Sequence, residues 1–266
     1  MSKKIKIVVI TQNDIYAIPK NFKLLCDEKC IEIKELILVE TKSALQNKKF
    51  LFVRGFGFFQ SIKMLIITII YFLKSFIAHN IFFINRPEWL NLKGLCSLHS
   101  IPLARHSNIN NTDLLMHLSK INPDVIVSFS APTVFKSDLL NIPKYGCINL
   151  HCSALPSYSG VLPSFWTLFK NENSAGVSVH IMDSKIDNGP VLSQKQIDIS
   201  NLNSMFKVIQ STKISGGYLM LNVLKYINEK EKLPEPIDVT NNAFSYYSWP
   251  TIDDFRTFVS KGKKLV

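Results

Sequence analysis

Short, continuous apolar runs alternate with amphipathic segments along most of this chain. The runs 4–10, Ile31–Val39 and Val125–Phe129 have the length and composition of buried strands. The segment between the first two of these runs, and the segment Thr112–Ile121, have apolar residues at helical spacing. Strands that alternate with helices in this way predict an α/β fold, a three-layer, mostly parallel open sheet of the Rossmann-like kind.

The second half of the chain continues the pattern. It predicts a strand at 147–150, a helix at 162–170, and two further strands at 176–182 and 190–199. A long helix is predicted over 202–229, interrupted at Gly216-Gly217, and a short helix over 251–260. In the first half of the chain, a short strand is also expected around 95–98. We expect a main domain over residues 1–200 and a C-terminal helix and tail extension over 201–266.

One apolar segment does not fit this scheme. From Phe56 to Ile84 the chain is nearly continuously hydrophobic, yet it falls short of 18 uninterrupted apolar residues because Lys63 and Lys74 divide it. These lysines lie about three helical turns apart and, with Gln60, form a narrow polar stripe. Such a helix can be buried in the domain, form a homo-oligomer interface, lie in a membrane interface or span a membrane.

The net charge and the cysteines bear on three questions: which partners the protein binds, whether it binds a metal, and where it is located. The formal net charge of +11 favours anionic partners, but the lysines are dispersed and form no recognisable nucleic-acid module. The five cysteines have no paired metal-ligand spacing, so no metal site is expected. The N-terminal apolar run is too short for a secretory signal, which predicts a cytoplasmic protein.

The loops after the strands argue against one common class of cofactor. The turn after the first strand, residues 11–14, lacks the G-x-G-x-x-G pattern that brings a pyrophosphate to a helix N-terminus, and the G-x-G fragment at Gly55 and Gly57 follows no clear strand. A dinucleotide is therefore disfavoured. The strand 125–129 instead ends in a loop of small residues at the edge where open α/β sheets bind ligands.

Three polar side chains predict a catalytic site. Asn149 and His151 are two residues apart in one strand, so they point to the same face, and Asp187 follows the next strand in an Asp-Asn-Gly-Pro turn. An amide, an imidazole and a carboxylate supply an oxyanion donor, a titratable group and an orienting anion. A His–Asp pair of this kind is also common as a buried structural couple, so both interpretations stay open on these residues alone.

The run Asn149-Leu150-His151-Cys152-Ser153-Ala154-Leu155-Pro156 resembles the folate-dependent formyltransferase family, as do Gly160 and the downstream Asp187-Asn188-Gly189-Pro190. That family includes methionyl-tRNA formyltransferases, glycinamide ribonucleotide formyltransferases and sugar-nucleotide N-formyltransferases. The likeness covers about residues 120–200, the formyltransferase catalytic domain. It implies N10-formyltetrahydrofolate as the formyl donor.

The resemblance also implies roles for matched residues. Asn149 would bind the formyl oxygen, His151 would stabilise the tetrahedral intermediate, and Asp187 would help to remove a proton from the attacking amine. Backbone contacts to the pterin are implied for the two loops, with these cofactor-binding residues: Ser128, Phe129, Ser130, Ala131, Pro132, Asn188 and Gly189. Ser159 stands where many members have arginine, so acceptor preference is expected to differ.

The expected acceptor is a small, anionic amine, namely a nucleotide-linked amino sugar. The residues after 200 read as one long helix and a tail rather than the barrel domain with which the tRNA enzymes grip tRNA, so tRNA is not expected. The alternatives are a methionyl-tRNA formyltransferase, a formyltetrahydrofolate hydrolase, and a non-catalytic, membrane-recruited binding module with the same fold. The helix from Phe56 to Ile84 makes a membrane-peripheral enzyme a further expectation.

Overall fold

A seven-stranded sheet forms the centre of the molecule. The computed structural model describes residues 4–40, 51–80, 86–241 and 243–266. The strand order is β3-β2-β1-β4-β5-β7-β8, in which the first five strands are parallel and β7 and β8 are antiparallel to their neighbours. The strands are β1 (Ile5–Thr11), β2 (Ile31–Val39), β3 (Leu103–His106), β4 (Val125–Phe129), β5 (Cys147–His151), β7 (Ser174–Ile181) and β8 (Val191–Asp198).

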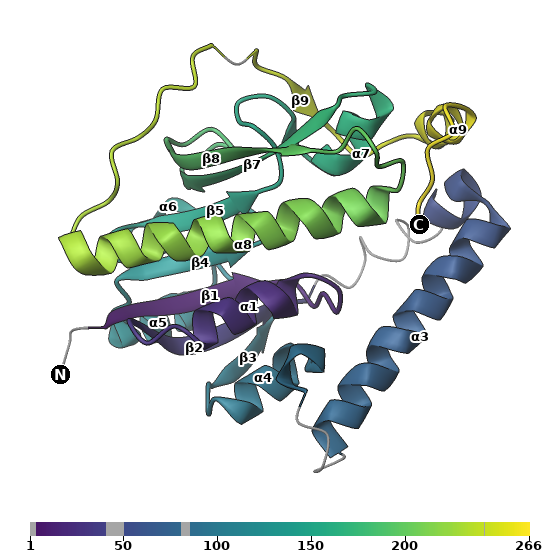
Figure 1. Ribbon diagram of the computed structural model, residues 1–266. Helices are drawn as coiled ribbons and strands as arrows, with labels where there is room; N and C mark the ends of the chain where they lie inside the picture. The colour runs from purple at the N-terminus through teal and green to yellow at the C-terminus, as the bar shows by residue number, and fades with distance from the viewer. Residues whose placement is uncertain (1–3, 41–50, 81–85, 242) are drawn as a thin grey trace.

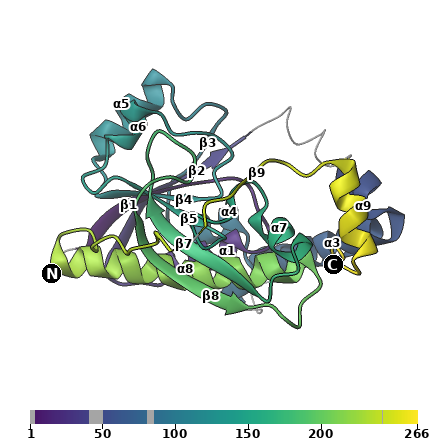
Figure 2. The same ribbon diagram turned by 90° about the horizontal axis from the view of Figure 1, so that it is seen from above.

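Helices cover both faces of this sheet, which confirms the predicted three-layer, mostly parallel α/β fold. Figure 2 shows α5 (Thr112–Ile121) and α6 (Ser137–Leu140) on one side, and α1 (Ile18–Cys26) and α8 (Met205–Lys230) on the other. The remaining elements are α3 (Phe58–Asn80), the 3-10 turn η1 (Pro87–Trp89), α4 (Leu92–Leu98), α7 (Pro163–Phe169) and α9 (Ile252–Ser260). A separate small parallel pair joins β6 (Ser159–Gly160) to β9 (Tyr246–Tyr247).

Alternation along β1 builds the core on both faces. Ile7 and Val9 pack in the cluster that contains α1, α4 and α8, whereas Val8 and Ile10 pack in the cluster under α5 and α6. All four side chains are fully buried. A central parallel strand that is buried on both faces reads as a continuous apolar run, which is why the sequence pattern located it correctly.

The strand predicted around 95–98 is wrong, because this segment belongs to the helix α4. Asn91 caps the helix through its side-chain oxygen, which accepts from Gly94 N at 2.9 Å. Leu92, Leu95 and Cys96 then lie at helical spacing and are buried in the core. The edge strand of the sheet is β3, which begins at Leu103.

The helix α8 is continuous through Gly216-Gly217, so the predicted interruption is also wrong. Both glycines let the helix approach its neighbours closely. A Cβ on Gly216 would lie 2.4 Å from Leu150 Cδ1, and one on Gly217 would lie 2.4 Å from Asn21 Oδ1. The helix thereby contributes Met220 and Leu224 to the same core cluster as β1. The boundary expected at residue 200 stays a prediction.

A third, aromatic cluster joins the C-terminal segment to the domain. Phe165 of α7 stacks on Phe258 of α9 with ring centroids 4.6 Å apart, and Phe56 contacts Phe255 at 5.0 Å. The helix α9 begins with a reciprocal capping box between Thr251 and Asp254. The chain end is therefore packed against the main domain beside α7 (Figure 1).

Candidate active site

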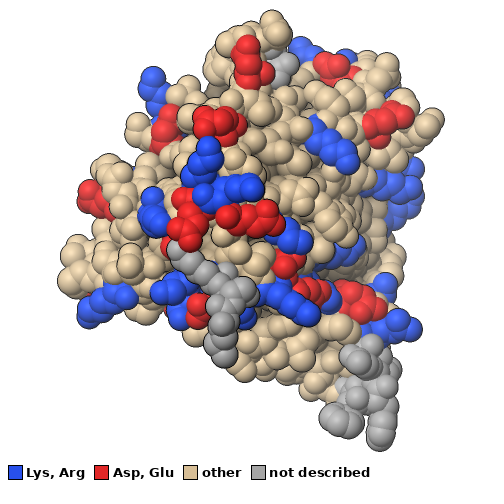
Figure 3. Space-filling model, turned by 60° about the vertical axis from the view of Figure 1, so that its left-hand side comes forward, with Lys and Arg blue, Asp and Glu red and all other residues tan. Residues whose placement is uncertain are grey.

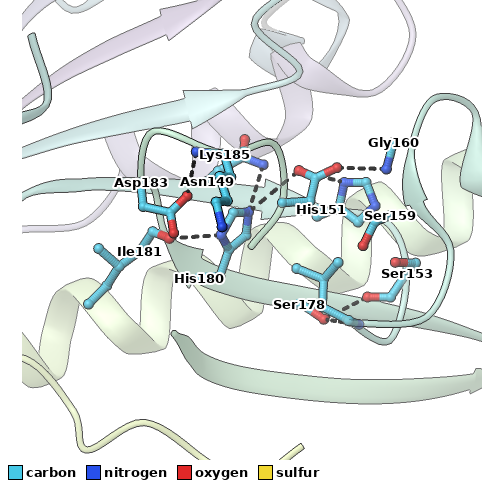
Figure 4. Close-up of polar contacts among 12 residues, drawn as sticks. Asn149, His151, Ser153, Ser159, Gly160, Ser178, His180, Ile181, Asp183 and Lys185 are labelled. Atoms are coloured by element: carbon cyan, nitrogen blue, oxygen red, sulfur yellow. Dashed lines mark hydrogen bonds and ion pairs between the residues drawn. The ribbon is translucent and has the colours of Figure 1, made fainter. Parts of the chain in front are cut away.

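The strand pair β5–β7 positions the first two predicted side chains. Asn149 lies opposite His180 in the antiparallel register, and His151 lies opposite Ser178. Asn149 is half-buried and His151 is buried. Figure 4 shows both side chains close to the turn that follows β7. The structure therefore brings together the three residues that the motif placed at this edge, Asn149, His151 and Asp187.

Both ring nitrogens of His151 face oxygen atoms. The Nε2 atom lies 3.1 Å from the Tyr158 backbone carbonyl, and the Nδ1 atom lies 3.5 Å from Asp187 Oδ1. A backbone carbonyl only accepts hydrogen bonds, so Nε2 carries a hydrogen. Asp187 then provides an acceptor for a second hydrogen on Nδ1. This arrangement is suited to an imidazole that gains a positive charge during a reaction.

Asp187 is held in a fixed orientation by the loop opposite to it. Its Oδ2 atom accepts from Gly160 N at 2.8 Å, while Oδ1 faces the histidines. The side chain is only 10% exposed, and its backbone has a φ of 51°, in the left-handed region. The following turn packs tightly, because a Cβ on Gly189 would lie 1.9 Å from Ile181 O.

His180 is a fourth polar side chain of the site that the sequence analysis missed. Its Nδ1 atom lies 2.9 Å from Ile181 O, so Nδ1 carries the hydrogen and Nε2 accepts from Asn149 Nδ2 at 3.1 Å. Burial, followed by the proximity of His151, lowers the pKa of His180 to about 4, so this imidazole is neutral at physiological pH. His180 could have been identified from its position opposite Asn149, but that position is known only once the antiparallel register of β5 and β7 is known.

Buried hydroxyls support the loop that follows His151. Ser178 Oγ donates to Ser153 O at 2.6 Å and accepts from Leu155 N at 3.1 Å. A Cβ on Gly176 would lie 2.1 Å from Ala154 N, so the loop crosses β7 in direct contact with its backbone. These contacts hold the loop after β5 at the point where Asn149 and His151 leave the strand.

The C-terminal segment completes this support, a role that the sequence analysis did not foresee. Strand β9 pairs with β6, and Tyr247 stacks between Tyr158 and Trp166 at centroid distances of 5.4 and 4.8 Å. Burial and a hydrogen bond from its hydroxyl to Glu172 raise the pKa of Tyr158. The tail thus holds the loop that presents Tyr158 O to His151 and Gly160 N to Asp187.

The residues predicted to contact a pterin lie at the same edge but differ in accessibility. Ser128 and Phe129 are buried, and Phe129 O already accepts from Thr11 Oγ1 at 2.6 Å. Contacts from this loop to a pterin would therefore come from residues 130–132. Asn188 is exposed and donates to Asp183 Oδ2 at 3.0 Å. The pterin contacts of both loops stay predictions.

Ser159, the departure from the motif, is built into the support rather than exposed. It is 1% exposed, its hydroxyl donates to Pro156 O at 3.1 Å, and its backbone N donates to Ser245 O at 2.9 Å. The position at which the resemblance implies an arginine is thus filled here by a short side chain under the tail. Its effect on acceptor preference stays a prediction.

Metal-ligand clusters and the thiol next to His151 are two further features of the described residues. No group of three or more His, Cys, Asp and Glu residues there could hold a metal ion. Burial raises the pKa of the Cys152 thiol, which opposes formation of a nucleophilic thiolate beside His151. The set of an amide donor, an imidazole and a largely enclosed carboxylate is suited to stabilising an oxyanion and moving a proton.

Comparisons with known proteins agree with this chemistry. Residues 90–224, about half of the chain, match the formyl transferase family. The chain is 38% identical over 149 residues to the bifunctional polymyxin resistance protein ArnA of Wigglesworthia glossinidia brevipalpis, covering 56% of this chain and 22% of the relative. It is 29% identical over 153 residues to the methionyl-tRNA formyltransferase of Thermodesulfovibrio yellowstonii, covering 58% and 49%.

Solved structures with a similar fold include formyltransferases. The N-formyltransferase from Helicobacter canadensis, solved with folinic acid and dTDP-3-aminofucose, superposes with a TM-score of 0.57 at 17% identity, covering 97% of this chain and 82% of that one. The chain spans between a fifth and a half of the length of the two curated relatives. The matched residues include β4, β5, β7 and β8 and therefore all four polar side chains of the site. The chain belongs to the formyl transferase family.

Proposed function

We propose that the protein transfers a formyl group from N10-formyltetrahydrofolate to a primary amine. The observation that carries the proposal is the convergence of Asn149, His151 and Asp187, which come from one strand end and the turn after the neighbouring strand. Support for the donor comes from the family match and from the Helicobacter canadensis relative, which was solved with folinic acid.

In the proposed reaction the amine nitrogen bonds to the formyl carbon, and the carbonyl oxygen becomes an oxyanion. Asn149 Nδ2 has two hydrogens, of which one is donated to His180, so the other is available for that oxyanion. His151 lies beside Asp187, and in this reaction it would take up a proton on Nδ1, which faces Asp187 Oδ1 at 3.5 Å.

The intermediate then collapses as the bond between the formyl carbon and N10 breaks. The proton lost by the amine must reach N10, the leaving nitrogen. Asp187 and His151 lie in contact and provide a relay for it, with Asp187 held in place by Gly160 N. No enzyme nucleophile is needed, in agreement with the raised pKa of the Cys152 thiol.

The proposed acceptor is an amino group on a nucleotide-linked sugar. The structural relative that was solved with dTDP-3-aminofucose supports this class, and the net charge of +11 favours an anionic substrate. Methionyl-tRNA is a second candidate because the Thermodesulfovibrio yellowstonii relative is named for it. Water, which would make the protein a formyltetrahydrofolate hydrolase, and a non-catalytic binding role are the remaining alternatives.

The test is incubation with N10-formyltetrahydrofolate and each candidate acceptor. A sugar nucleotide that gains the mass of one formyl group supports the proposal. Formyl-methionyl-tRNA would select the second candidate, and formate released without an amine would select the hydrolase. His151→Ala and Asp187→Asn should reduce turnover by at least about a hundredfold. His117→Ala is a matched control, because His117 pairs with Glu35 away from the site. Absence of turnover with every acceptor would reject the enzyme.

A further inference from the structure

The helix α3 turns polar side chains toward the protein. Gln60 Oε1 accepts from Val266 N at 3.3 Å, and Thr68 Oγ1 lies 2.7 Å from Tyr16 Oη. Ser75 is buried, and its Oγ accepts from Asn91 N at 3.1 Å. The docked stripe thus contains an amide and two hydroxyls at helical spacing.

The opposite side of α3 is apolar and exposed. Ten large hydrophobic side chains on this helix are more than a third exposed. They are Phe58, Phe59, Ile62, Leu65, Ile66, Ile69, Ile70, Phe72, Leu73 and Phe76. On a helical wheel they occupy one continuous arc. A surface helix of a soluble protein has the reverse arrangement, so this outer arc is built to contact an apolar medium.

The charged residues on α3 and in the sequence next to it are all basic, which favours contact with an anionic surface. Lys63 and Lys74 are eleven residues apart and so lie on one side of α3, between the docked stripe and the outer arc. No acidic residue occurs between Glu40 and Glu88, whereas seven basic residues do. They are Lys42, Lys48, Lys49, Arg54, Lys63, Lys74 and Arg86. In contrast, Figure 3 shows Lys and Arg interspersed with Asp and Glu on the face that it presents.

The contacts of α3 show how it would meet a membrane. By length and composition it is the one helix in the described part of the chain that could cross a bilayer, with a mean hydropathy of 1.8. Yet Gln60 near its start and Ser75 near its end are both bonded to the domain, so the helix runs along the protein (Figure 1). A helix fixed at both ends in this way would lie in the membrane plane rather than cross it.

A second copy of the chain is a poorer partner for this arc. If two α3 helices packed antiparallel about Ile69, Lys63 would come near the partner's Lys74, and in a parallel pair equivalent lysines would meet. No carboxylate on either helix could compensate, because α3 contains none. Anionic lipid headgroups supply the missing negative charge, and the acyl region accepts the apolar arc.

We propose that α3 binds in the plane of an anionic membrane surface. The outer arc, from Phe58 to Phe76, enters the boundary between headgroups and acyl chains, and Lys63 and Lys74 contact lipid phosphates. The folded domain stays outside the bilayer. This inference is independent of the proposed reaction, because it depends only on α3 and its contacts.

The test is sedimentation of the full chain with phosphatidylcholine vesicles, with and without phosphatidylglycerol. We expect binding to the anionic vesicles. Leu65→Ser/Ile69→Ser/Phe72→Ser should weaken it about tenfold or more. Binding to anionic vesicles should weaken by about fivefold per lysine in Lys63→Gln/Lys74→Gln, while binding to neutral vesicles should stay unchanged. Met116→Ser is the matched control: Met116 is 53% exposed and lies on α5, on the other side of the sheet.

Circular dichroism and analytical ultracentrifugation complete the design. The altered side chains are exposed, so the variants should keep the wild-type spectrum and unfolding temperature. The proposal is wrong if the wild type does not bind anionic vesicles, or if the triple serine variant binds as well as the wild type. A lipid-free dimer that the triple variant converts to a monomer, without vesicle binding, would assign the arc to a second copy instead.

Discussion

Asn149 and His180 face each other across the β5–β7 strand pair, with Asn149 Nδ2 3.1 Å from His180 Nε2. The neutral imidazole accepts one amide hydrogen and thereby fixes the orientation of the other. His180 is buried and its pKa is lowered to about 4, so we expect it to act as a positioning residue rather than as an acid or base. The orientation of the Asn149 amide, the proposed oxyanion donor, thus depends on a residue outside the motif.

We therefore expect His180→Ala to lower kcat about tenfold to a hundredfold, because the Asn149 amide is free to rotate. His180→Gln offers an acceptor oxygen and should restore part of the loss. Steady-state kinetics with separate kcat and KM values provide the measurement. If both variants change KM alone, His180 acts in substrate binding and the positioning role is incorrect.

The same residue predicts a pH dependence of stability. The pKa of His180 is about 4 in the fold, against a usual value near 6.5, so below pH 6.5 the unfolded chain binds a proton that the native state does not. The contribution of His180 to the free energy of unfolding should fall as the pH drops from 6.5 toward 4. Urea unfolding across this range should show a smaller decline for His180→Gln. Parallel curves for the two proteins would contradict the prediction.

Gly160 is expected to tolerate no side chain. Its φ is +96°, and a Cβ would lie 2.3 Å from Tyr247 O. Gly160→Ala should separate β6 from β9, displace the N–H that orients Asp187, and lower kcat at least about tenfold. Gly262→Ala is the control, because Gly262 also has a positive φ but has no atom within 4 Å of its Cβ position. Equal activity of the two variants would argue against this support.

The tail should matter to activity through Tyr247. Tyr247→Ala removes the ring between Tyr158 and Trp166 and should destabilise the protein by about 3 kcal/mol while lowering kcat. Tyr246→Ala, on the same strand but 52% exposed, should change both quantities little. Thermal unfolding and turnover should be measured on both variants. If Tyr246→Ala and Tyr247→Ala had similar effects, stacking of Tyr247 between Tyr158 and Trp166 would not be what supports activity.

An ion pair at the start of α1 provides a stability prediction. Burial raises the pKa of Asp14. The charge of Lys213 and hydrogen bonds from three backbone N–H groups lower it by a larger amount, so the pKa lies below its usual value. Asp14→Asn should cost about 3 kcal/mol, because Lys213 is left buried without its partner. The wild-type contribution is present above pH 4 and is lost as the pH falls below the usual value of 3.8.

Chemical denaturation at neutral pH measures that cost. Glu32→Gln removes the exposed Lys34–Glu32 pair and is the control, with an expected effect below about 1 kcal/mol. An Asp14→Asn variant as stable as this control would show that the Asp14–Lys213 pair contributes nothing.

Local sequence signals were sufficient for most of the fold and for the motif residues. Apolar runs located β1, β2 and β4 because central strands are buried on both faces. The two-residue spacing of Asn149 and His151 placed them on one face, since that periodicity is a property of the strand itself. Asp187 was found because it stands in the turn after β7.

Contacts between distant segments decided the rest. Gly216 and Gly217 were misread as a helix break because only the packed structure shows the close approach of α8 to Leu150 and Asn21. His180 and the tail strand β9 became part of the site through strand pairing, which no local pattern specifies. The sequence by itself determined the central strands and the positions of Asn149, His151 and Asp187 at strand ends, because these follow from local apolar runs and spacing. Tertiary packing decided which residues hold them in place and that α3 faces outward, because register and burial depend on partners far away in the chain.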